Sequence, residues 1–398
     1  MWMVKKQRER GVLGTCGVAH FLHDGFSDVL YLLFPIWQAE FALSLTQVGL
    51  LKGIFSTAMA SMQIAAGLLA ERLGERTLLA VGTMVAAIGF ASLGLTGGFV
   101  TLALCLAIVG AASSVQHPLC SSLIANAYER GGRRAALGIY NFTGDVGKFA
   151  FPGLAALAAT SFHWSQVTTG FGGFGLLVAI GITIVLTLLG AGGRASAFIA
   201  GPRANLKSSD WGIQNKRGFV ALSSIGMIDM ATRTAFLTFV PFLLTDKGAS
   251  VQTVGIALSL VFAGGAAGKF VCGILAERFG IFLVVILTEM LTACGIILLL
   301  FLPLIGCLVL LPIIGVVLNG TSSVLYGTVA ELVTTERRAR TYALFYTLGT
   351  IAGALSPSIY GVVSDVYGIY FALAITSVVL LTTLPLTEVF RRSLRRAA

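Results

Sequence analysis

The chain has 398 residues, of which 56% are hydrophobic and 11% are charged, and its mean hydropathy is +0.91. This composition excludes a soluble globular domain of this size and indicates a polytopic membrane protein. Long apolar runs between short polar connections predict helices rather than the alternating strands of a membrane barrel. The fold class we expect is an all-α membrane protein.

The net charge of +10 is distributed in a pattern that sets orientation. Basic residues gather before the first apolar run, after the last one and in every second connection between them. This positive-inside pattern predicts an even number of spans with both termini in the cytoplasm, and it needs no nucleic-acid partner. The basic positions are Lys5, Lys6, Arg8, Arg10, Arg72, Arg76, Arg130, Arg133, Arg134, Arg194 to Arg217, Arg278, Arg337, Arg338, Arg340 and Arg391 to Arg396.

Twelve transmembrane helices account for the apolar runs. We expect them at 11–36, 47–70, 77–98, 100–124, 135–160, 166–190, 218–245, 251–273, 281–303, 304–330, 341–364 and 368–390. An internal repeat divides them into two sets of six, because GLLAERLG from Gly67 returns as GILAERFG from Gly273, a displacement of 273 − 67 = 206 positions. The same displacement carries Pro35 to Pro241.

The repeat predicts two pseudo-symmetric six-helix bundles, at 11–192 and 218–390. A cytoplasmic linker at 193–217 joins them, and cytoplasmic tails at 1–10 and 391–398 flank them. Parallel halves with a site near the midplane are the architecture of a transporter that works by rocking.

The span 11–36 carries ionisable groups where apolar residues are expected. At about 100° per residue, His20, Asp24 and Tyr31 share one face, with Asp28 at its edge and His23 on the other flank. An ionised carboxylate at bilayer depth costs roughly 3 kcal/mol, so this face should line a watered cavity inside the protein. The alternative is that these groups brace neighbouring helices.

Polar residues in other spans extend this expected cavity. Asp145 and Lys148, three positions apart, can pair directly, and Asp229 and Arg233 share one helical face. A pair between Asp28 and Arg233 would link the halves as a gate. The Asp145–Lys148 and Asp28–Arg233 pairs can also be only structural. The other expected cavity residues are Gln116, His117, Asn141, Asn319 and Tyr326. The six cysteines all fall inside spans, so we predict packing roles, no disulfide and no metal site.

The repeated loop Gly-x-Leu-Ala-Glu-Arg-x-Gly resembles the signature loop of the major facilitator superfamily, whose twelve-span plan matches the whole chain. The stretches 20–24, 113–118 and 144–152 resemble the fosmidomycin-resistance branch of drug-efflux proteins. The resemblance implies a major facilitator fold and a cytoplasmic latch between helices. Its residues would be Gly67, Glu71, Arg72, Gly74, Arg76, Gly273, Glu277, Arg278 and Gly280. The chain departs from many exporters of this kind by lacking an arginine between Leu102 and Gly110.

The resemblance implies a proton-coupled secondary transporter that exports a small organic molecule by alternating access from the plasma (bacterial inner) membrane. Asp24 is the expected proton carrier, with His20 or His23 as relay. Proton-coupled uptake of a small charged metabolite or metal ion through the same cavity is the alternative, and a non-transporting receptor is a third possibility.

Motifs for other classes of protein do not occur in the sequence. It contains no phosphate-binding Gly-x-x-x-x-Gly-Lys loop, nucleophile elbow or zinc-ligand spacing, which disfavours an ATP-driven pump and an enzyme. We therefore expect a monomer without a cofactor, whose partners are its small-molecule substrate, a proton and the lipid bilayer.

Overall fold

The structure, a computed structural model, describes residues 2–129, 131–193, 212–329, 332–334 and 338–395. Within these ranges the chain is helical, apart from turns and one isolated antiparallel bridge between Ile213 and Val333. The expected all-α class is therefore confirmed.

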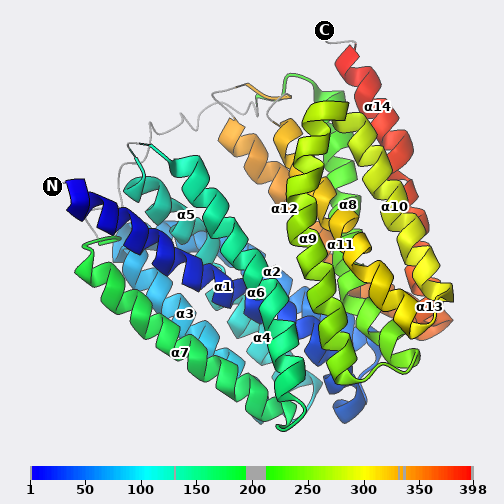
Figure 1. Ribbon diagram of the computed structural model, residues 1–398, viewed down its shortest axis with the longest axis horizontal. Coiled ribbons are helices and arrows are strands. Elements are labelled where there is room, and N and C mark those ends of the chain that lie inside the picture. Colours follow the sequence, from blue (N-terminus) through cyan, green and yellow to red (C-terminus); the bar gives the residue numbers. More distant parts are fainter. Residues whose placement is uncertain (1, 130, 194–211, 330–331, 335–337, 396–398) are drawn as a thin grey trace. The chain divides into compact units, whose positions relative to one another are not determined.

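The first half of the chain forms seven α-helices and one 3₁₀ turn within the described ranges (Figure 1). They are α1 (Trp2–Phe41), α2 (Leu45–Leu73), α3 (Glu75–Ser92), η1 (Leu93–Leu95), α4 (Phe99–Ser113), α5 (Gln116–Ala127), α6 (Arg133–Ala158) and α7 (Trp164–Leu188). The expected span 100–124 is divided into α4 and α5. Pro118 lies in the first turn of α5, where its missing N–H leaves no helical hydrogen bond unmade.

The second half forms seven α-helices in its described residues. They are α8 (Lys216–Asp246), α9 (Val251–Phe279), α10 (Ile281–Phe301), α11 (Leu304–Val329), α12 (Arg338–Tyr367), α13 (Ile369–Leu381) and α14 (Thr383–Arg395). Helices α13 and α14 follow each other directly and together form the last expected span.

Eight helical segments within the described residues are long and apolar enough to cross a membrane. They are α3 with η1, α4 with α5, α7, α8, α9, α10, α11 and α13 with α14. The remaining expected spans correspond to α1, α2, α6 and α12, each of which has at least 26 residues. The polar residues that lower the hydropathy of α1 and α6 include the candidate site residues described below.

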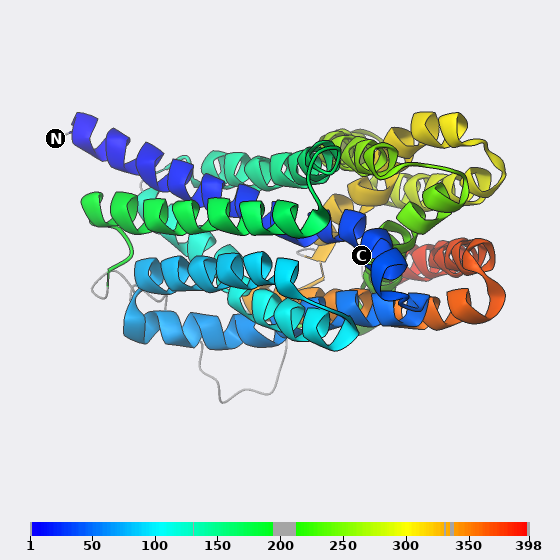
Figure 2. The same cartoon turned by 90° about the horizontal axis from the view of Figure 1, so that it is seen from below.

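The helices gather into two compact units. The first comprises Met1–Ile36 and Ile54–Ala204, and the second comprises Trp37–Gly53 and Asn205–Ala398. Within the first unit, α3 packs along α7 in both views (Figures 1 and 2). The units differ from the expected bundles in one respect, because the end of α1 and the start of α2 pack with the second unit.

The repeat inferred from the sequence is visible in the backbone. Gly74 and Gly280, separated by 280 − 74 = 206 positions, both have φ of 86° and both precede a helix, α3 or α10. Ser44 and Ser250 share the same displacement, and each side-chain oxygen accepts a hydrogen bond from a backbone N–H at the start of α2 or α9. Glycine is needed at the two turns because other residues rarely adopt positive φ.

A contact between α2 and α12 explains why the start of α2 belongs to the second unit. The Asp365 carboxylate accepts hydrogen bonds from the backbone N–H groups of Leu45 and Thr46, each at 2.8 Å, and from the Thr46 hydroxyl at 2.5 Å. A Cβ atom on Gly49 would lie 2.1 Å from the Pro357 carbonyl oxygen, so glycine permits this close approach. Asp365 thus caps the first turn of a helix far from it in sequence.

We expect Asp365→Ala to lower the free energy of unfolding by about 1 kcal/mol, because it leaves two helical N–H groups without their acceptor. Partial burial raises the pKa of Asp365, but the hydrogen bonds from Thr46 and Leu45 outweigh it and hold this pKa below its usual value. The stabilisation is therefore complete above the ordinary aspartate pKa and is lost as pH falls through the lowered one. Thermal unfolding of the purified protein measures both effects, and equal stability of the parent and the variant at neutral pH would contradict the cap.

Candidate functional site

Four side chains converge on the carboxylate of Asp24, which is 6% exposed in the middle of α1. Its Oδ2 atom lies 3.2 Å from His20 Nε2 and 3.3 Å from Lys148 Nζ. Its Oδ1 atom lies 3.9 Å from both His23 Nε2 and His117 Nε2. These residues come from α1, α5 and α6, all within the first unit, and we call them the Asp24 cluster.

Two glycines allow α6 to approach α1 at this cluster. A Cβ atom on Gly144 would lie 2.5 Å from His20 Nε2 and 2.6 Å from Asp24 Oδ2. A Cβ atom on Gly147 would lie 2.1 Å from a backbone oxygen of α1. Lys148 follows one turn after Gly144, so the close packing of the two helices is what brings its ammonium group to the carboxylate.

The hydrogen bonds of His20 determine where its protons lie. Its Nδ1 atom is 2.8 Å from the Tyr140 carbonyl oxygen, which can only accept, so Nδ1 carries a hydrogen. Its Nε2 atom faces Asp24 Oδ2, and two lone pairs at this distance would repel each other. A hydrogen bond between Nε2 and Oδ2 therefore requires one proton, held either as imidazolium with carboxylate or as imidazole with carboxylic acid.

Lys148 contacts two carboxylates rather than one. The expected pair with Asp145 is present at 3.8 Å, but Lys148 is closer to Asp24, at 3.3 Å. The sequence paired Lys148 with Asp145 of its own helix and did not predict its contact with Asp24, because that contact comes from another helix.

His117 and Lys148 are the accessible members of the cluster, with side chains 42% and 30% exposed. The break between α4 and α5 places His117 in the first turn of α5. Its ring packs edge-on against the rings of His20 and His23, with centroids 4.9 and 4.7 Å apart. His117 therefore lies beside a helix break and also belongs to the cluster.

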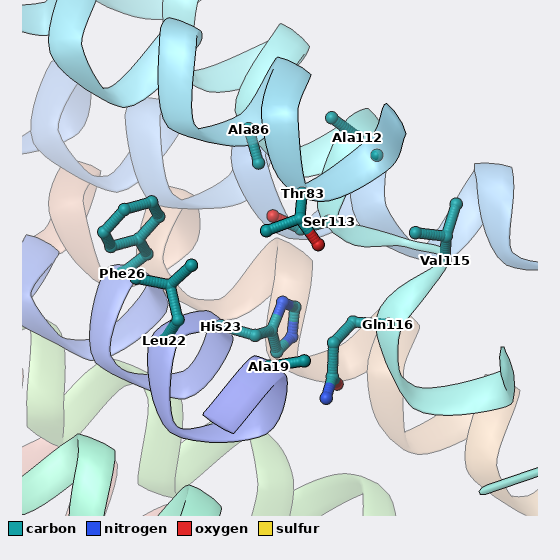
Figure 3. Close-up of a pocket in the computed structure, with 11 residues that line it drawn as sticks. Ala19, Leu22, His23, Phe26, Thr83, Ala86, Ala112, Ser113, Val115 and Gln116 are labelled. Atoms are coloured by element: carbon teal, nitrogen blue, oxygen red, sulfur yellow. The ribbon is translucent and has the colours of Figure 1, made fainter. Parts of the chain in front are cut away.

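A cavity of about 20 Å³ lies on the far side of His23 (Figure 3). Polar lining comes from His23, Thr83, Ser113 and Gln116. The Gln116 Nε2 atom has no hydrogen-bond partner among the described residues, while its Oε1 atom accepts from the Tyr140 hydroxyl at 3.4 Å. The cavity has room for one water molecule, which would accept from Gln116 and connect it to His23.

The cluster also contains a possible cation site. His20, Asp24 and His117 each offer a ligand atom, and these atoms lie within 4.8 Å of one another. Imidazole and carboxylate donors suit divalent transition-metal ions. The sequence predicted no metal site, because it shows no zinc-ligand spacing and its cysteines were expected to serve in packing. A metal ion at this position would have to displace the ammonium group of Lys148 from Asp24.

The second unit buries acidic groups of its own. Asp229 on α8 is buried, and the half-buried Arg233 places an Nη2 atom 2.7 Å from the Met230 sulfur. Glu289 on α10 is 1% exposed, and one of its carboxylate oxygens has no hydrogen-bond partner among the described residues. Glu289 was not among the expected site residues, and its only signal was an acidic residue inside an apolar run.

Other expected cavity residues have contacts of their own. Tyr31 is buried and packs edge-on against Phe34. Asn141 is exposed on α6. In the second unit, Asn319 donates to a carbonyl of its own helix and Tyr326 stacks on Tyr346. The Asp28 and Arg233 gate stays a prediction, since its two residues belong to different units.

The expected latch also stays a prediction. Its glycines Gly74 and Gly280 form the turns described above, and Gly273 lies within α9. The surroundings of Gly67 and the side chain of Glu71 lie outside the described part of the chain. Exposed or half-buried members are Arg72, Arg76, Glu277 and Arg278.

The sequence comparisons with known proteins agree on one family of transporters. Residues 16–228 and 222–397 each match the sequence profile of the Major Facilitator Superfamily. The Fosmidomycin resistance protein of Escherichia coli (strain K12) is 25% identical over 69% of this chain and 67% of its own length. Multidrug efflux pump LfrA of Mycolicibacterium smegmatis (strain ATCC 700084 / mc(2)155) is 28% identical, over 41% of this chain and 31% of its own.

Solved structures show the same fold. A bacterial homologue of the human lysosomal transporter Spinster, in an inward-facing and occupied conformation, aligns with a TM-score of 0.81 at 18% identity, covering 96% of both chains. A mutant of nucleoside transporter NupG aligns with a TM-score of 0.80 at 14% identity, covering 96% of this chain and 99% of its own.

We expect Gly144→Ala to destabilise the protein by about 1 to 3 kcal/mol and to disrupt the Asp24 cluster, because the added methyl group overlaps His20 and Asp24. Gly138→Ala on the same helix is the matched control, since its Cβ atom would meet nothing within 4 Å. Thermal unfolding of the two purified variants measures the difference. Equal stability of the two variants would show that α6 does not pack against α1 as described.

Proposed function

The chain belongs to the major facilitator superfamily, and we propose that it is a proton-coupled secondary transporter that exports a small organic molecule by alternating access. The twelve-helix fold and the family expected from the repeated loop are confirmed. The chain is therefore an integral membrane transporter. Export is supported by its likeness to one protein named for drug resistance and to another named as a multidrug efflux pump.

The observation that carries proton coupling is the short distance of His20 Nε2 and Lys148 Nζ from the same oxygen of Asp24, 3.2 and 3.3 Å. Adding a proton to the imidazolium–carboxylate form of the pair neutralises the Asp24 carboxylate and removes its attraction for Lys148. The attraction of Lys148 for Asp145, at 3.8 Å, is retained. Because Asp24 lies on α1 and Lys148 on α6, the proton changes the force between two helices.

The accessible side chains of the Asp24 cluster give a proton a route to the His20–Asp24 pair. His117 lies at the accessible side of the cluster and His23 at the small polar cavity, and both imidazoles face the same oxygen of Asp24. An imidazole can accept a proton at one nitrogen and release one from the other. We assign His117 to the entry of protons and His20 to holding the shared proton.

The charge of the substrate decides whether it exchanges with the proton or moves with it. A cationic group on the substrate competes with the proton for Asp24, so binding one expels the other and produces exchange. An anionic group would bind Lys148 only after a proton has released it from Asp24, so substrate and proton would travel together. Export driven by proton entry therefore fits a small organic molecule that carries a cationic group.

A second candidate function is the uptake of a small charged metabolite or a divalent metal ion. The ligand atoms of His20, Asp24 and His117 support a metal ion as the transported species, because they lie within 4.8 Å of one another. The relative named Probable L-galactonate transporter, from Escherichia coli (strain K12), is 22% identical over 60% of this chain and 55% of its own length. An anionic metabolite would use Lys148 as described above.

Orientation is part of the proposal. Basic residues in alternate connections support a cytoplasmic position for both termini and insertion in the bacterial inner membrane. The protein would work as a monomer, because the central cavity of this fold is formed within one chain.

We expect Asp24→Asn to abolish transport driven by a pH gradient, with a fall of about tenfold or more, since the variant keeps the side-chain volume but loses the titratable group. Purified protein in proteoliposomes, screened with small organic cations and anions, provides the assay. Asp246→Asn, an exposed substitution on α8, is the control that should retain transport. Full pH-driven transport by Asp24→Asn would contradict the assignment of the proton carrier.

A further inference from the structure

A groove of about 470 Å³ lies in the second unit, between the start of α10 and the last turns of α14. Most of its wall is apolar, and its polar groups lie on α14 alone. The lining residues are Phe279, Gly280, Phe282, Leu283, Ile286, Thr387, Glu388, Arg391 and Leu394. Phe279 and Leu283 are exposed, so the groove opens to the surroundings of the protein.

The polar edge of the groove has an excess of positive charge. Glu388 lies 2.8 Å from Arg391 Nη2 and 2.7 Å from Arg392 Nε, so one carboxylate is shared by two guanidinium groups. The Nε atom of Arg391 is buried and has no hydrogen-bond partner among the described residues. Arg391 lines the groove, whereas Arg392 does not. The Arg391 side chain is 43% exposed, so the remaining N–H donors of its guanidinium group can reach an anion in the groove.

The groove lies at the level of the membrane surface on the side where we place the cytoplasm. Basic residues at 391–396 and Arg278 mark that side, while the apolar wall continues along α10 into the expected membrane span 281–303. The cytoplasmic leaflet is the one whose anionic lipids attract clusters of arginine and lysine. A ligand that matches this surface has an anionic head at Arg391 and a hydrocarbon part along α10.

We propose that this groove is a binding site for an anionic phospholipid of the cytoplasmic leaflet. The phosphate accepts hydrogen bonds from the Arg391 guanidinium group, and the first part of one acyl chain packs on Phe282, Leu283 and Ile286. A soluble anion would leave the apolar wall uncovered, and a zwitterionic lipid would gain less from the net positive edge. The proposal depends on the orientation given above but not on proton coupling.

Native mass spectrometry of the purified full chain with an equimolar mixture of phosphatidylglycerol and phosphatidylcholine tests the site. The parent should retain phosphatidylglycerol preferentially, and Arg391→Gln should reduce that preference by about tenfold, the effect of one charge-assisted contact. Arg392→Gln changes the net charge equally at a residue that does not line the groove, so its loss of preference should be clearly smaller than that of Arg391→Gln. Glu388→Gln, which removes the competing carboxylate, should increase it.

Three results would overturn the proposal. Equal loss in Arg391→Gln and Arg392→Gln would mean that general surface charge attracts the lipid. An unchanged preference in Arg391→Gln would mean that the lipid binds elsewhere. Displacement of phosphatidylglycerol by inorganic phosphate would mean that the apolar wall plays no part. Ile286→Trp, which fills the groove, should lower the retention of both lipids. None of these experiments measures transport, so their outcome does not depend on the proposed function.

Discussion

A carboxylate inside a membrane-spanning helix is stable only when a proton or a nearby cation offsets its charge. At Asp24 the groups that can do so are His20, whose Nε2 atom lies 3.2 Å away, and the ammonium group of Lys148, 3.3 Å away. Both contacts depend on the close approach of α6 to α1, which Gly144 and the glycine one turn later make possible. The packing of the first unit and the neutralisation of this single charge are therefore parts of one constraint.

The same constraint makes the site responsive. Lys148 contacts two carboxylates on two helices, so any cation that reaches Asp24 redistributes its contacts toward Asp145. A proton, a cationic substrate and a metal ion are alternatives at that position, and each would weaken the attraction between α1 and α6. His117 and Lys148 are the accessible side chains of the Asp24 cluster, whereas His20 and Asp24 are buried.

Sequence patterns were sufficient to predict those features of the structure that depend on local periodicity or on a repeated motif. The shared face of His20 and Asp24 and the displacement of 206 positions follow from spacing along the chain, and both agree with the structure. The approach of Lys148 to Asp24 could not be predicted, because it depends on how closely two helices pack. Glu289 was visible as a charge in an apolar run, but nothing local indicated that one of its oxygens is left without a partner in the described residues.

The central claim is that Asp24 and His20 share a proton and that Asp24 accepts a further one. Infrared difference spectroscopy of the purified protein, recorded as pH is lowered, measures this directly and needs no substrate. The account predicts a carboxylic acid C=O band that appears with falling pH in the parent and is missing in Asp24→Asn, with a different pH dependence in Lys148→Gln. An identical set of bands in the parent and in Asp24→Asn would contradict it.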